Sequence, residues 1–169
     1  MKKAFKILMA AVMMTATVGA VSCSKDKGDE KESTRFAFIY NGETLDAGQT
    51  IRHNPTQTEL QDDQATVEFL INNKTENEIN GKVQLEKLDG PVAMDTLTIH
   101  IGQSTSEIKG NWPWKSENIA IAPGVNQNKK IKIVYKPSGV TALTRYRFVV
   151  GEGGNLSDPE VIFIELATR

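Results

Sequence analysis

The residue types that most often carry catalysis or bind metals are scarce in this chain, which has two histidines and one cysteine among 169 residues. His53 and His100 do not form a His-Glu-x-x-His zinc motif. No Gly-x-Ser-x-Gly sequence supplies a nucleophilic serine. Asp62, Asp63 and Asp158 lack the spacing of an EF-hand calcium loop. We therefore expect no catalytic residue, no metal and no cofactor, with both histidines structural or on the surface.

Acidic residues are the one exception, because 21 Asp and Glu are enough for the fold to bring two carboxylates together. Two carboxylates about 5–10 Å apart in a pocket would be the arrangement of a glycosidase. A hydrolase therefore stays open as a third hypothesis, although the sequence contains no motif that supports it.

The best candidates for binding a ligand are Trp112 and Trp114, which flank the stiff residue Pro113. Aromatic side chains on a rigid loop stack on sugar faces or anchor a protein partner. In the alternative interpretation one or both indoles close an end of the hydrophobic core. The sequence leaves both roles open and does not distinguish a glycan from a protein ligand.

The lone cysteine, Cys23, follows an apolar segment and reads as a lipidation site. Lys2, Lys3 and Lys6 are followed by a stretch from Ile7 to Val21 without charge. Fifteen residues are short of the roughly 20 that span a bilayer, so a signal peptide over residues 1–22 fits better. Small residues just before Cys23 resemble a lipobox, and ordinary secretory cleavage nearby is the alternative.

A charged segment separates Cys23 from the first apolar alternation. Residues 23–34 are expected to form an acylated cysteine and a disordered tether, since 24–33 contain no large apolar residue. This segment resembles the acidic export signal that Bacteroidetes-type bacteria use to place lipoproteins on the outer face of the outer membrane. A plain solvated spacer is the alternative. Acylation would anchor the chain to a membrane without a spanning helix.

From Arg35 onward the sequence predicts one β domain, residues 35–169. Apolar and polar residues alternate in short runs between turn signals such as Asn41-Gly42, and no window shows a sustained helical period. This pattern is typical of an antiparallel, immunoglobulin-like β-sandwich of about eight or nine strands, with a closed barrel as the alternative. The expected strands are 36–40, 49–53, 67–71, 83–86, 97–101, 119–121, 131–133, 146–150 and 161–166.

Two stretches carry a family resemblance. Residues 38–48, with their Asn-Gly turn, and residues 119–124, with their Pro-Gly turn, resemble small immunoglobulin-like domains of Bacteroidetes-type surface lipoproteins. Many of those domains hold a cysteine pair in a central loop, where this chain has Trp112-Pro113-Trp114 instead. The resemblance implies no enzymatic activity. In the same bacterial group Asp95-Thr96-Leu97 resembles an O-glycosylation motif, which makes Thr96 a candidate site or simply a strand residue.

Charge and export together define the expected function. After loss of Lys2, Lys3 and Lys6 the mature chain has 17 basic and 21 acidic residues, a balance that argues against nucleic acid as a partner. The leading hypothesis is a lipid-anchored, non-enzymatic binding or adhesion module, exposed on the cell surface at the outer membrane. The alternative is a structural accessory subunit of an outer-membrane complex.

Overall fold

A computed structural model describes residues 35–90, 96–136 and 143–167. The chain divides into units 1–30 and 31–169, and all described residues belong to the second unit. The expected signal peptide (1–22), Cys23 and the tether (23–34) lie outside the described residues. Within the described ranges, no helix is long and apolar enough to cross a membrane.

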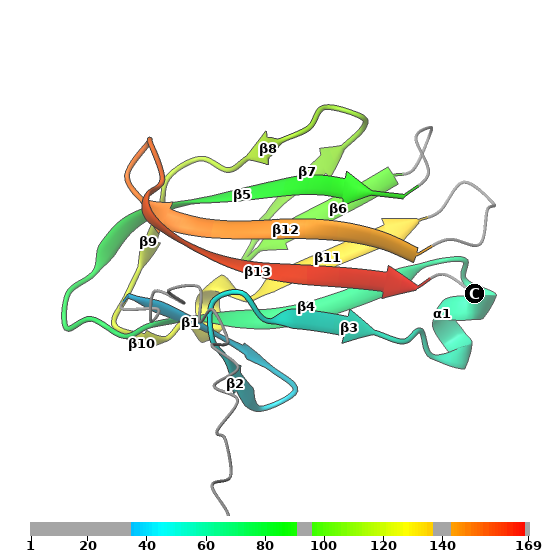
Figure 1. The fold of residues 1–169 in the computed structure, drawn as a ribbon, viewed down its shortest axis with the longest axis horizontal. Coiled ribbons are helices and arrows are strands. Elements are labelled where there is room, and N and C mark those ends of the chain that lie inside the picture. Colours follow the sequence, from blue (N-terminus) through cyan, green and yellow to red (C-terminus); the bar gives the residue numbers. More distant parts are fainter. Residues whose placement is uncertain (1–34, 91–95, 137–142, 168–169) are drawn as a thin grey trace, which may run out of the picture. The chain divides into compact units, whose positions relative to one another are not determined.

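The first of two facing β-sheets has the strand order β2-β1-β4-β11-β6-β7, and β10 also pairs with β4 (Figure 1). All of its pairings are antiparallel. The strands are β1 (Phe36–Tyr40), β2 (Glu43–Leu45), β4 (Ala65–Asn73), β6 (Thr96–Ile101), β7 (Ser104–Ile108), β10 (Gly124–Val125) and β11 (Ile131–Lys136).

The second sheet has the order β3-β13-β12-β5-β8, and β9 also pairs with β5. Its β3–β13 pairing is parallel and the others are antiparallel. The strands are β3 (Thr50–His53), β5 (Ile79–Asp89), β8 (Trp114–Lys115), β9 (Ile119–Ile121), β12 (Leu143–Glu152) and β13 (Ser157–Ala167).

This arrangement confirms the expected all-β, immunoglobulin-like sandwich, with two open sheets and not a closed barrel. The additional strands are short, with two to five residues each, and include β7 and β8. The Asn41-Gly42 turn joins β1 to β2, and both residues have a positive φ, 51° and 84°. Positive φ at both central residues of a two-residue hairpin is the geometry that Asn-Gly favours.

The core lies between the inner faces of the sheets, which the alternation of apolar residues defines. On β4, and on β13 from Glu160 onward, every second side chain is buried, as the period of a strand requires. Three phenylalanines meet in the middle: Phe38 and Phe69 from the first sheet and Phe148 from the second. The Phe69 and Phe148 ring centroids are 4.9 Å apart at an edge-to-face angle, a favoured aromatic geometry.

The outer face of the second sheet is charged. Glu165 on β13 accepts hydrogen bonds from Arg145 on β12 (2.7 Å) and from Arg52 on β3 (3.0 Å). These two guanidinium groups hold the pKa of Glu165 below its ordinary value, Arg145 having the larger effect. Because the charged side chains of these strands face water, the apolar side chains that alternate with them face the core.

The structure also contains a short helix, α1 (Gln57–Gln61), which the pattern of apolar residues did not predict. Its start carries a capping box, in which the Thr56 hydroxyl accepts from the Glu59 N–H and the Glu59 carboxylate accepts from the Thr56 N–H. The same carboxylate accepts from the Thr66 N–H of β4 (2.6 Å) and contacts His53 Nε2 on β3 (3.0 Å). Glu59 therefore ties α1 to both sheets.

The environment of Glu59 lowers its pKa. Burial of the carboxyl group raises the pKa, but the backbone N–H groups of Thr56 and Thr66, the Thr56 hydroxyl and the charge of His53 outweigh burial. A carboxyl group with a depressed folded-state pKa stabilises the fold above its unfolded pKa, and this stabilisation disappears as the pH falls through the folded-state pKa.

We expect Glu59→Gln to lower the free energy of unfolding at pH 7 by about 1–3 kcal/mol, because hydrogen bonds to a charged acceptor are lost. The difference from wild type should shrink as the pH falls below 4.5, the ordinary pKa of the group. Urea unfolding at several pH values measures both effects. The exposed Glu76→Gln is the matched control and should change neither; equal curves for wild type and Glu59→Gln would contradict the role of Glu59.

Candidate functional site

The two tryptophans lie at the edge of the sandwich, half-buried against the core. Trp114 pairs with the buried Leu85 of β5, so its side chain points to the same inner side. Trp112 lies two residues earlier, and its ring is 5.6 Å from that of the buried Tyr146. Both indoles close part of the core, and each keeps a solvent-exposed part.

A serine fixes the chain immediately after Trp114. The Ser116 hydroxyl accepts a hydrogen bond from the Val83 N–H of β5 (3.0 Å) and donates to the Glu117 carbonyl (2.6 Å). The Ser116 N–H donates to the Val83 carbonyl (2.9 Å). The two bonds to Val83 hold the end of β8 against β5 and thereby fix the backbone next to Trp114.

Beside Trp114 a cleft of about 220 Å³ opens between the edge of the first sheet and the edge of the second. Ile99, Ile101, Trp114 and Ile119 supply apolar surface, and Ser104 and Ser106 of β7 supply hydroxyl groups. Drug-sized ligand pockets measure roughly 300–1,000 Å³, so this cleft fits a single side chain or a small ring better than a whole cofactor.

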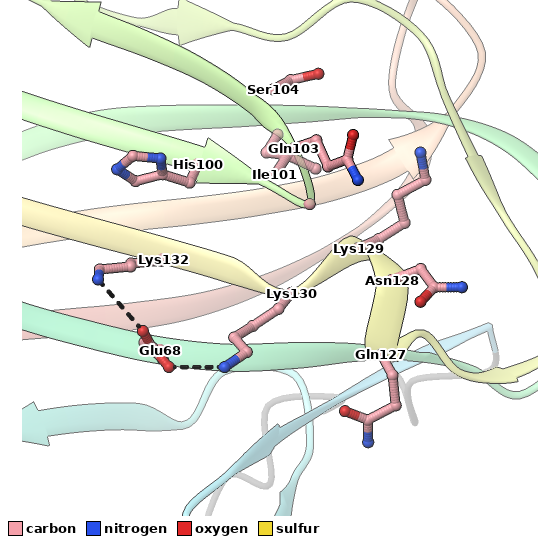
Figure 2. A pocket seen from close by; sticks show the side chains of 11 residues that line it. Glu68, His100, Ile101, Gln103, Ser104, Gln127, Asn128, Lys129, Lys130 and Lys132 are labelled. Atoms are coloured by element: carbon pink, nitrogen blue, oxygen red, sulfur yellow. Dashed lines mark hydrogen bonds and ion pairs between the residues drawn. The ribbon is translucent and has the colours of Figure 1, made fainter.

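A second, more open depression of about 700 Å³ lies on the outer face of the first sheet (Figure 2). Lys130, which directly precedes β11, and Lys132 of β11 converge on Glu68 of β4, at 2.9 Å and 3.6 Å. The Lys130 hydrogen bond is the larger cause of a lowered pKa at Glu68. His100 of β6 contacts the Thr105 hydroxyl of β7 at 2.9 Å.

The cleft and the depression adjoin, because Ile101, Ser104 and Lys129 line both. Lys129 ends the short 3-10 helix η1 (Gln127–Lys129), and no ion pair holds its ammonium group among the described residues. We call the combined surface the edge groove. It runs from Trp114 around the β6–β7 turn to Lys130 and Lys132.

A third depression, of about 580 Å³, contains His53, Glu59 and Glu68 and so bears on the hydrolase hypothesis. A general acid needs a raised pKa to hold its proton at neutral pH. The pKa values of Glu59 and Glu68 are both lowered. Both carboxylates are also committed to structural contacts, so these two groups are poor acid catalysts.

Of the remaining residues that the sequence analysis singled out, His100 lies in the edge groove, and the others fall outside it or outside the described chain. Thr96 begins β6, where it is half-buried and pairs with Lys136 of β11. His100 contributes to the groove, whereas His53 packs on Glu59. In the described ranges no group of three or more His, Cys, Asp or Glu residues could hold a metal ion. Cys23 lies outside those ranges.

Sequence reasoning did not identify β7 or Lys129 as part of a site. The signal for β7 is the Gly102-Gln103 pair between two alternating runs, which marks a two-residue hairpin. For Lys129 there is no local signal, because its place depends on η1 meeting the β6–β7 turn. There Gly102 comes so close to the Asn128 carbonyl that an added Cβ would lie 2.4 Å from that oxygen.

Comparison with known proteins finds likeness in structure only. No protein-family model and no curated protein sequence matches the chain. The N-terminal domain of PorA superposes with a TM-score of 0.58 at 12% identity, covering 79% of this chain and 96% of that one. At this identity the likeness supports the fold alone.

Two further solved structures superpose more loosely and support no argument. A conjugative transposon lipoprotein from Bacteroides eggerthii DSM 20697 has a TM-score of 0.38 at 10% identity, covering 81% of this chain and 99% of that one. The PapD-like domain 7 of human CEP192 has a TM-score of 0.40 at 9% identity, covering 81% of this chain and 87% of that one.

We expect Trp112→Ala to lower the free energy of unfolding by about 2 kcal/mol, less than the roughly 3–5 kcal/mol for a fully buried aromatic, because Trp112 is only half-buried. Trp112→Phe keeps a ring against Tyr146 and should cost less. Denaturant unfolding followed by circular dichroism measures both variants. An unchanged midpoint for Trp112→Ala would show that the indole does not close the core.

Proposed function

We propose that this protein is a lipid-anchored, non-enzymatic binding module of the cell envelope, which takes its ligand in the edge groove. The observation that supports the proposal most is the composition of the groove, whose two parts share three lining residues. It joins a half-enclosed apolar cleft beside Trp114 to a polar surface that carries Lys129. Apolar contact together with a few oriented polar groups is what binding sites use for affinity and orientation.

The chemistry of the groove supports binding more than catalysis. Its acidic groups are Glu68, which is paired with two lysines, and Glu117. Ser104 and Ser106 have no histidine beside them in the cleft to activate a hydroxyl. The groove thus offers hydroxyl groups, ammonium groups, the imidazole of His100 and apolar surface, a set that suits the binding of a protein or glycan ligand.

The location is proposed from the sequence. Acylation of Cys23 would hold the domain on a membrane, and the acidic tether favours the outer face of the outer membrane in a Bacteroidetes-type envelope. Thr96 remains a candidate for O-glycosylation. Together these features agree with a surface-exposed module whose groove faces external ligands.

The competing proposal is an accessory subunit packed against another envelope protein, which would need a broad exposed apolar face. In the described part of the chain the exposed large apolar side chains lie on different elements, namely Leu60, Leu88, Val125 and Leu143. The outer faces of both sheets carry ion pairs instead. These observations favour the binding module.

External protease on intact cells tests the anchor and the location. Wild type should be digested at the surface, and Cys23→Ala should lose membrane partition because it cannot be acylated. Resistance of wild type to protease would contradict surface exposure. Membrane partition of Cys23→Ala equal to that of wild type would contradict the lipid anchor.

Binding to a combined glycan and protein array tests the groove. Trp114→Ala should reduce ligand binding at least tenfold, because the cleft loses its aromatic wall, and Lys129→Ala should reduce it less. Lys136→Ala is the matched control, since Lys136 is exposed but does not line the groove. Thermal unfolding confirms that each variant is folded. Equal binding by Trp114→Ala, or no binding by wild type, would contradict the proposal.

A further inference from the structure

The free edge of β7 is the best-formed unpaired strand edge in the described part of the chain. β7 has five residues, whereas the other terminal strands, β2, β3, β8 and β9, have two to four. Natural sheets protect exposed edges with proline, with charged side chains, lysine above all, or with a bulge. The β7 sequence, Ser-Thr-Ser-Glu-Ile, contains neither proline nor lysine and a single charged residue, Glu107, and its pairing with β6 is regular throughout.

The geometry of the β6–β7 hairpin shows which backbone groups point outward. Ile101 pairs with Ser104 across a two-residue turn, and Gly102 has φ of +60°, as the first central residue of a type II′ turn requires. The residues that flank such a turn bond to each other, and the bonding direction then alternates along the strand. Thr105 and Glu107 therefore direct their N–H and C=O groups away from β6, toward the free edge.

The cleft lies directly beside this edge. Ser104 and Ser106 of β7 form one wall, and Trp114 and Ile119 from the second sheet form the opposite wall. A strand added to β7 would direct every second side chain toward the inner side, as β7 itself does. One apolar side chain of such a strand would enter the cleft and contact Trp114.

The charge at one end of the edge determines where an acidic residue of the added strand lies. Lys129 lies next to Ser104, at the start of β7, and has no ion-pair partner among the described residues. Lys130 and Lys132 share one carboxylate, Glu68, so this end is positive. At the other side of the cleft Glu117 is negative. An acidic residue is therefore accommodated beyond Ser104 and disfavoured beside Glu117.

We propose that β7 binds an extended peptide segment of another protein by strand addition, with an apolar side chain in the cleft and an acidic residue against Lys129. This inference rests on the proposed binding function and names its ligand class. Main-chain hydrogen bonds to Thr105 and Glu107 supply affinity, and the cleft and Lys129 supply selectivity, as in other cases of strand addition.

The test uses the full-length purified protein and a display library of random twelve-residue peptides. Enriched peptides are titrated by calorimetry against Thr105→Pro, which removes an outward N–H without breaking the β6 pairing. Thr105→Ala is the matched control, since it loses the same hydroxyl but keeps the N–H. We expect at least a tenfold rise in Kd for Thr105→Pro, less than twofold for Thr105→Ala, and a severalfold rise for Lys129→Gln.

If Thr105→Pro fails to fold, amide hydrogen exchange on the wild-type protein tests the same contact without a variant. Bound peptide should slow exchange at Thr105 and Glu107 more than tenfold. No enriched peptide, equal binding by Thr105→Pro, or unchanged exchange would overturn the inference. So would a wild-type dimer in sedimentation that Thr105→Pro abolishes, because a second copy would then occupy the edge.

The outcomes for the two proposals are distinguishable. If no peptide is enriched but array binding depends on Trp114, the binding module stands and only the peptide ligand is wrong. If the protein binds nothing on the array and enriches no peptide from the library, the proposed function itself is wrong.

Discussion

Contact between phenylalanines from opposite sheets is the interaction on which the rest of the structure depends. With one cysteine in the chain, no disulfide within the chain can join the sheets. Phe38 and Phe69 meet Phe148 edge to face across the interior, with ring centroids 5.9 Å and 4.9 Å apart. Such pairs add about 0.5–1.5 kcal/mol each beyond the burial of their surface. The spacing of the sheets follows from this packing, and so does the space left at their edge.

The edge groove exists because the aromatic packing between the sheets does not extend to β7 and β8. Toward β7 and β8 the strands are short, and the inward side chains change from phenylalanine to serine, as at Ser104 and Ser106. Trp112 and Trp114 cover part of the gap and leave a cleft beside them. The tryptophans therefore have a structural and a surface side, and the two roles that the sequence left open are compatible.

The sequence predicted the fold well because alternation reports burial directly. Each expected strand coincides with a strand of the sandwich, and Phe148 and Ile133 lie on the buried side that the period of two assigns. The capping box at Thr56 and Glu59 was readable in principle, but five residues are too few for a helical period. Lys129 was not predictable, because its position comes from a tertiary contact.

The parallel pairing of β3 with β13 has a consequence for the order of folding. Arg52 and Glu165, neighbours across this pair, are separated by 113 positions in the chain. β13 also lies between β3 and β12, so in a fragment that stops before Ser157 β3 would lack its strand partner and β12 would keep only β5. Contacts so distant along the chain slow folding through the entropy of loop closure. β3 can therefore join the second sheet only after the segment from Ser157 onward has been synthesised, whereas β5, β8, β9 and β12 can pair before that.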